Sequence, residues 1–178
     1  LSLAALGLNI LTGYCGQVSL GHGAFMAVGA YAAYNFALRI PELNFLLVLI
    51  LAGGTAALVG MIFGIPSLRI KGLYLAVATL AAQFFIDWVF ARVKWFTNNS
   101  ASGSVSVPDV TMLGFTFDSP ERRYILVLAI VALFALLAKN LVRGHVGRSW
   151  MAIRDMDVAA EVIGIRPVYA KLSAFAVS

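Results

Sequence analysis

The sequence predicts an all-α, polytopic integral membrane protein. Of its 178 residues, 61% are hydrophobic and 12% are charged, whereas about a quarter of the residues in soluble domains are charged. Its uncharged stretches are close to the length that one helix needs to cross a hydrocarbon core of ~30 Å, and short polar or basic segments separate them. We expect about six transmembrane segments, the first and last truncated, in a single transmembrane domain over residues 1–178 of a longer chain.

The first apolar stretch must contain a turn. Residues 1–38 include no Asp, Glu, Lys or Arg, and one helix of that length would measure about 57 Å, nearly two membrane crossings. The turn falls in GYCGQVSLGHG, residues 13–23, where four glycines and the polar side chains of Gln17, Ser19 and His22 interrupt the apolar pattern.

This glycine-rich segment also predicts an interrupted helix at membrane depth. Residues 24–38 alone would reach only about 22 Å, so the second helix should begin nearer Gln17. Non-helical backbone is tolerated at that depth only inside protein or beside a watery cavity, and transporters use such breaks to hold carboxylates. The candidate translocation-pathway residues are Gly16, Gln17, Ser19, Gly21 and His22.

A second interpretation of the same segment involves packing alone. Glycines also permit two helices to approach closely. Ser19 would then bond back to its own helix, and His22 would be a packed histidine with no ligand role. The sequence leaves both interpretations open.

Three further spans are expected at residues 45–65, 73–91 and 124–142, each uncharged or nearly so. Gln83 and Asp87 lie near one end of the second of these spans. A polar pair in that position can simply meet water, so neither residue is assigned a role.

Basic residues set the expected orientation. Six of the thirteen Lys and Arg residues fall in 139–171, and cytoplasmic connections are enriched in these residues. The connection at 143–167 is therefore expected in the cytoplasm, and 92–123 becomes an external loop. Within 92–123, the alternating Val105, Val107 and Val110 suggest a short hairpin.

The cytoplasmic connection contains an unusually charged stretch. On a helical wheel of residues 147–164, Arg154, Asp157 and Glu161 share one side, and a stripe opposite them consists of Ala152, Met156, Ala159 and Ile163. Gly164 is expected to cap this helix, and Pro167 would prevent its continuation.

Such a helix could lie in the lipid headgroup region and only connect two spans. It could also dock on a partner, because Ala159, Ala160 and Gly164 leave its backbone bare on one side.

Residues in this helix carry a resemblance to a known family. VAAEVIG, residues 158–164, resembles the EAA loop of ABC importer permeases, with Val158 where Glu is usual. GRSWMAIRDMDVAAEVIGI as a whole resembles that loop in LivM-type permeases of branched-chain amino acids. Residues 7–31 and 64–81 resemble the same family, in the family's order. At 97–103, TNNSASG stands where the family tends to have T-G-G-x-x-G.

The resemblance implies a permease subunit of a branched-chain amino-acid importer in a prokaryotic cytoplasmic (inner) membrane. The implied partners are a homologous second permease, two ATPase subunits, an external substrate-binding protein and the lipid bilayer. The charged helix would be a coupling helix that sits in a groove of an ATPase subunit. The residues assigned to ATPase coupling are Gly147, Arg148, Arg154, Asp155, Ala159, Ala160 and Gly164.

The chain itself should be neither an enzyme nor a cofactor binder. It has no G-x-x-x-x-G-K-[ST] motif to cradle ATP phosphates, so ATP hydrolysis is expected on a partner. The single Cys15 and the lack of a Cys/His cluster predict no disulfide and no metal site. The net charge is +5, but the Lys and Arg residues stand at the ends of apolar runs, where they would meet lipid or mark the cytoplasmic side. We therefore expect no nucleic-acid partner.

Three alternatives stay open for the function. Within the same superfamily, urea or a short amide could be the substrate. A secondary transporter or channel without ATP coupling would be expected to carry an ionisable residue in mid-membrane, and the apolar segments offer essentially none. A membrane assembly protein would not require the glycine-rich break.

Overall fold

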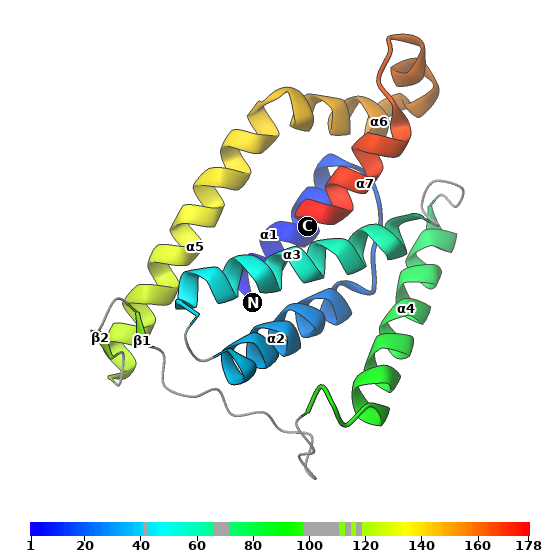
Figure 1. Ribbon diagram of the computed structural model, residues 1–178. Coiled ribbons are helices and arrows are strands. Elements are labelled where there is room, and N and C mark those ends of the chain that lie inside the picture. Colours follow the sequence, from blue (N-terminus) through cyan, green and yellow to red (C-terminus); the bar gives the residue numbers. More distant parts are fainter. Residues whose placement is uncertain (41–42, 66–71, 98–110, 113–114, 117–118) are drawn as a thin grey trace.

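The computed structural model describes residues 1–40, 43–65, 72–97, 111–112, 115–116 and 119–178. Its helices are α1 Ser2–Asn9, the π-helix η1 Ile10–Tyr14, α2 His22–Arg39, α3 Phe45–Gly64, α4 Leu73–Arg92, α5 Pro120–Arg143, α6 His145–Val162 and α7 Pro167–Val177 (Figure 1). A two-residue hairpin pairs β1 Thr111–Met112 with β2 Phe115–Thr116. The predicted all-α class is confirmed.

Three of the described helices are long and apolar enough to cross a membrane, namely α3, α4 and α5. They correspond to the predicted spans at 45–65, 73–91 and 124–142. α5 begins four residues earlier than expected, because the Ser119 side chain accepts a hydrogen bond from Arg122 N and Pro120 occupies the first turn. The expected count of about six segments stays a prediction.

The prediction that α2 begins nearer Gln17 is wrong. α2 begins at His22, and its 18 residues give a length of about 27 Å. The preceding backbone is held outside a helix, because Gly16 has a φ of +70° and Leu20 N donates to Thr79 Oγ1 of α4 at 3.0 Å.

The core of the described chain joins η1, α6 and α7. Leu11 and Trp150 are fully buried in it, and Phe175 is 3% exposed. Trp150 Nε1 donates to Ser173 Oγ at 3.0 Å, which ties α6 to α7. In a second layer α2 packs against both α3 and α4.

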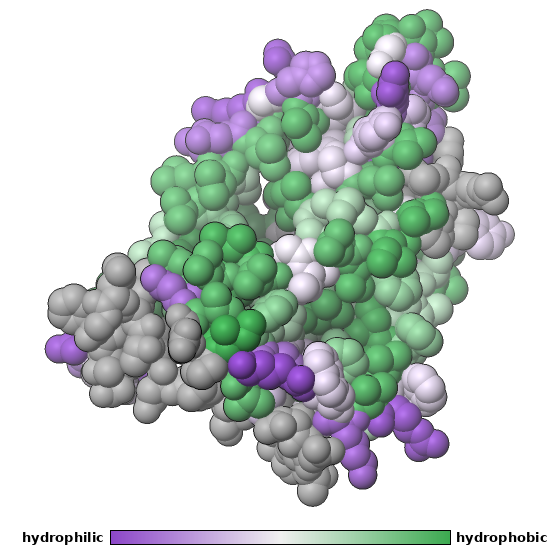
Figure 2. Space-filling view, viewed as in Figure 1, coloured by the Kyte–Doolittle hydropathy of each residue, from purple (hydrophilic) through white to green (hydrophobic). Residues whose placement is uncertain are grey.

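The outer surface is that of a multi-pass membrane protein. α5 has no buried residue in the described structure, and its apolar side chains face outward. Hydrophobic residues cover the middle of the face in Figure 2, and hydrophilic residues gather toward its two ends. The uncharged run of α5 from residue 124 to residue 138 suits lipid and would be unfavourable in water.

The loop between α4 and α5 runs from Val93 to Ser119, so the C-terminal part of the predicted 92–123 loop is already helical. The hairpin in this loop pairs Thr111 with Thr116 and Met112 with Phe115. The residues on which the hairpin prediction rested, 105, 107 and 110, lie outside the described residues. In Figure 1 the end of α4 and the start of α5 lie on the lower side, opposite the α5–α6 corner.

Candidate functional site

The first part of the site is the non-helical segment 15–21 between η1 and α2, called the break below. Three hydrogen bonds fix its path: Cys15 N donates to Ile10 O at 3.1 Å, Gln17 N to Leu11 O at 3.0 Å, and Leu20 N to Thr79 Oγ1 at 3.0 Å. The interrupted helix predicted from the sequence is therefore present. Its position in the depth of a membrane stays a prediction.

Two glycines of the break are required by their surroundings. Gly16 has a positive φ, and a Cβ there would lie 2.7 Å from Arg154 Cγ. A Cβ on Gly21 would overlap Thr79 O of α4. The backbone thus approaches α6 at one glycine and α4 at the other, as the packing interpretation expected.

The break and the first residue of α2 contain buried polar side chains. Gln17 and Ser19 are each 5% exposed. Gln17 Oε1, Ser19 Oγ and His22 Nδ1 are buried and find no hydrogen-bond partner in the described part of the chain. The packing interpretation, in which Ser19 bonds back to its own helix, therefore fails for that side chain. Buried polar atoms without partners are rare, so these three are candidates to meet water, solute or another subunit.

The second part of the site is α6. It begins at His145, two residues before the predicted Gly147, with Gly144 as its N-cap. Met156 has φ −155° and ψ 97°, so the helix is kinked there. The predicted continuous wheel is therefore wrong: Met156 is 70% exposed and Ile163 73% exposed, although both were placed on one continuous stripe. The residues of α6 that are buried are Gly147, Trp150, Ile153 and Ala160.

The predicted coupling residues divide between core and surface. Ala160 is 2% exposed and packs in the core, so it does not belong to a bare docking side. Gly147 is also buried, against the end of α5, because a Cβ there would overlap Val142. The exposed ones are Arg148, Arg154, Asp155, Ala159 and Gly164.

Beyond the kink, α6 ends in an apolar tip that the wheel missed. Val158, Val162 and Ile163 are 72%, 83% and 73% exposed. Together with Ala159 and Gly164 they form what is called the α6 tip below. Val158 and Val162 are four residues apart and therefore share one face of the segment after the kink. A helical wheel predicts this surface only if it begins after Met156.

Gly164 caps α6 as predicted. Its φ is +88°, its N–H donates to Glu161 O at 3.0 Å, and Ile165 N donates to Ala160 O at 3.0 Å. These are the two bonds of a Schellman motif. Pro167 then occupies the first turn of α7, so it opens the next helix as well as preventing continuation of α6.

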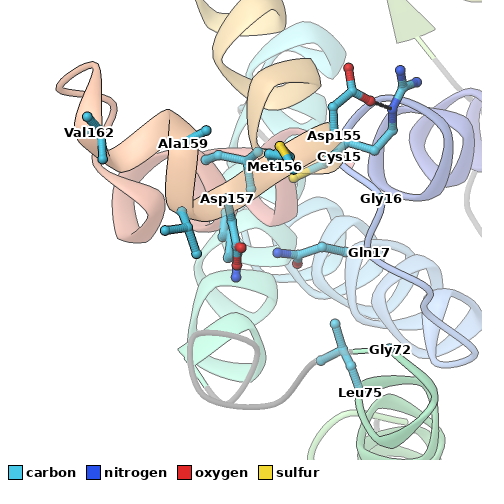
Figure 3. A pocket seen from close by; sticks show the side chains of 14 residues that line it. Cys15, Gly16, Gln17, Gly72, Leu75, Asp155, Met156, Asp157, Ala159 and Val162 are labelled. Carbon is cyan, nitrogen blue, oxygen red and sulfur yellow. Dashed lines mark hydrogen bonds and ion pairs between the residues drawn. The ribbon is translucent and has the colours of Figure 1, made fainter.

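The break and α6 meet directly. Arg154 Nη1 donates to Gly13 O at 2.9 Å, and its Nε pairs with Asp155 Oδ1 at 3.0 Å. The stem of the same arginine lies against the Gly16 backbone. A cavity of 610 Å³ opens beside this contact, with Gly16 and Gln17 on one wall and α6 on another (Figure 3).

The whole chain, residues 1–178, matches the family described as branched-chain amino acid transport system, permease component. The chain belongs to this permease family. It is 30% identical to the high-affinity branched-chain amino acid transport system permease protein LivM of Salmonella typhimurium, and equally to LivM of Escherichia coli. Each comparison covers 99% of this chain and 46% of the relative, so the chain spans about half the length of the curated relatives it matches. No solved structure matches.

In this permease-family chain, the cavity is lined by residues from both predicted sets, the translocation pathway and the ATPase coupling residues. Gly16 and Gln17 of the pathway set line it with Arg154, Asp155 and Ala159 of the coupling set. Ser19, Gly21 and His22 lie elsewhere, where the break passes α4 and enters α2. Within the described residues, no cluster of three His, Cys, Asp or Glu side chains could hold a metal ion.

Proposed function

We propose that this chain is a permease subunit of an ATP-driven importer of branched-chain amino acids in a bacterial inner membrane. Its partners would be a homologous permease, two ATPase subunits and an external substrate-binding protein. The family match over the whole chain supports this proposal. Two LivM relatives are named as permease proteins of high-affinity branched-chain amino acid transport.

The proposal gives the α6 tip the role of ATPase docking surface. Val158, Val162 and Ile163 expose large apolar side chains beside the small Ala159 and Gly164. Clustered apolar side chains at a helix end favour a protein or membrane contact over water. The bare backbone at Ala159 and Gly164 would let a partner approach closely.

The contact between α6 and the break is the observation that carries the proposal. A docking helix is useful in a transporter only if its displacement reaches the solute path. Arg154 supplies that connection, since it donates to Gly13 O and lies against Gly16. A rigid-body shift of α6 would therefore move the end of η1 and the break together.

The break would form part of the translocation path. Gln17, Ser19 and His22 offer buried polar atoms without partners in the described chain, and these suit transient contact with a zwitterion. Residues 1–38 supply no fixed charge to this path, so selection by net charge is not expected there.

Reconstitution of the full-length chain with its partner subunits in proteoliposomes tests the proposal. Uptake of leucine, valine and urea would be measured with and without ATP and with and without the external binding protein. The proposal expects uptake of leucine and valine that requires both components. Uptake that persists without ATP would support a secondary transporter or channel, and uptake of urea alone would support the amide alternative; either result overturns the proposal.

A further inference from the structure

The break is tied to different helices at its two ends. We call residues 15–17 its near half and residues 20–21 its far half. The near half follows η1 and α6, because Gln17 N donates to Leu11 O at 3.0 Å and the Arg154 side chain lies against the backbone of this half. The far half lies against α4 instead.

A single threonine of α4 holds the far half. Thr79 is 2% exposed, and its hydroxyl accepts from Leu20 N at 3.0 Å while it donates to Ala76 O at 2.9 Å. Gly21 lies so close to the same residue that a Cβ there would overlap Thr79 O. A hydroxyl group can donate one hydrogen bond and accept others, so Thr79 bonds to its own helix and to the break at the same time.

Val18 and Ser19 connect the two halves. Among the residues that the structure describes, none forms a hydrogen bond with the backbone of either one. Peptide units are planar, so a movement of one half against the other must come mainly from φ and ψ rotations at these two residues. Ser19 is 5% exposed, and its buried Oγ has no partner in the described chain. A hinge here would therefore turn a buried polar side chain.

The two helices that hold the break belong to different packing groups. α6 packs against α5, α7 and η1, whereas α4 packs against α2. A cavity of 610 Å³ lies between α6 and the start of α4, with Met156 on the α6 side and Leu75 on the α4 side (Figure 3). A displacement of α6 that Arg154 passes to the near half therefore does not require α4 to follow.

We propose that Thr79 is a positioning residue for transport, which holds the far half on α4 so that movement of α6 bends the break at Val18 and Ser19. The Ser19 hydroxyl then turns when α6 moves. The inference rests on the proposed function for the movement of α6, and the bond to Thr79 limits that movement to the near half. Without the Thr79 hydroxyl, the far half follows the near half, and the hinge no longer bends.

Thr79→Val tests this role, because valine keeps a branched side chain of similar size and removes the group that accepts from Leu20 N. In the reconstituted full-length complex, the number of ATP molecules hydrolysed per leucine imported should rise several-fold. Thr79→Ser keeps the hydroxyl and should restore the unaltered ratio. Thr55→Val is the matched control, since the Thr55 hydroxyl donates to Ala52 O within α3 and bonds to no other described element.

A double variant separates the hinge from general damage. Arg154→Met releases the near half, so adding Thr79→Val should raise the ratio no further than the larger single change. Two effects that multiply, an equal rise in Thr55→Val, or no restoration by Thr79→Ser would each overturn the inference. An unaltered ratio in Thr79→Val beside a raised ratio in Arg154→Met also overturns it and leaves the proposed function standing. Absence of ATP-dependent leucine uptake by the unaltered complex overturns the proposed function itself.

A measurement on the unaltered complex does not depend on the folding of any variant. Amide hydrogen exchange is followed at single-residue resolution by mass spectrometry, without nucleotide and with ATP plus orthovanadate. The Leu20 amide should keep its protection in both states, because its bond to Thr79 survives the movement. The amides of Val18 and Ser19 should change their exchange rates several-fold. Loss of Leu20 protection in the nucleotide-bound state would mean that the far half leaves α4, which overturns the inference.

Discussion

At the scale of single residues, the link between the break and α6 depends on one glycine and one arginine. Gly16 adopts a φ of +70°, which favours glycine, and has the Arg154 side chain directly against it. Arg154 in turn donates to Gly13 O. The sequence singled out Gly16 and Arg154 for separate reasons, the first as part of a polar interruption and the second as part of a charged helix.

Gly16→Ala should damage both stability and transport. An alanine at this φ costs about 1–2 kcal/mol, and its Cβ would also press on Arg154 Cγ. We expect a lower thermal midpoint and slower leucine uptake in the reconstituted complex. Gly53→Ala is the matched control, because Gly53 lies in α3 and a methyl group added there would have nothing within 4 Å. If both variants behave alike, the close contact of the Gly16 backbone with Arg154 does not affect stability or transport.

At the scale of elements, the apolar helices were predictable and the shape of α6 was not. Runs at 45–65, 73–91 and 124–142 predicted α3, α4 and α5 because length and composition alone decide a membrane span. The sequence does not predict the kink at Met156, because no Pro or Gly stands at that position. The wheel drawn through it therefore combined two helical segments with different orientations, and Ala160 was assigned to the wrong side.

Two neighbouring alanines of α6 now have opposite expected roles. Ala159 is exposed and Ala160 is buried. Ala160→Trp should overpack the core, cost about 1–3 kcal/mol or more, and lower the yield of folded protein. Ala159→Trp should leave the yield unchanged and weaken ATPase association. Yield is measured by fluorescence-detected size exclusion and association by co-purification of the ATPase; a folded Ala159→Trp complex that retains its ATPase would argue against docking through the α6 tip.

Gly164 should tolerate substitution less well than its exposure suggests. Its φ of +88° closes the Schellman cap of α6, and an alanine there costs about 1–2 kcal/mol. The thermal midpoint of Gly164→Ala should therefore fall, although no atom lies within 4 Å of the added methyl. An unchanged midpoint would mean that the cap does not limit stability.

At the scale of the whole molecule, helices that are far apart in sequence come together. The start of α5 and the corner between α5 and α6 lie on opposite sides in Figure 1, as expected for a helix that crosses the bilayer. The contact of Arg154 with Gly13 spans 141 residues of sequence. Composition and periodicity describe single helices. They singled out Arg154 and the segment 13–23 that contains Gly13, but they give no information on the contact between the two.

Orientation can be tested with two exposed glutamates. Glu121 begins α5 and Glu161 lies near the end of α6. In a Cys15→Ser background, a membrane-impermeant maleimide added to intact cells stripped of the outer membrane should label Glu121→Cys and leave Glu161→Cys unlabelled. Both variants should react after permeabilisation. The reverse pattern in intact cells would place α6 outside, where no ATPase could reach it.

The number of ATP molecules hydrolysed per leucine imported, measured for Arg154→Met in the reconstituted complex, tests the central claim most directly. Methionine keeps an unbranched apolar stem beside Gly16 and removes the guanidinium that bonds to Gly13 O. The account predicts that hydrolysis continues while uptake falls, so this ratio rises several-fold, whereas Arg143→Met, an exposed substitution at the end of α5, leaves it unchanged. An unaltered ratio in Arg154→Met, with normal rates of both reactions, would contradict the claim that α6 drives the break through this arginine.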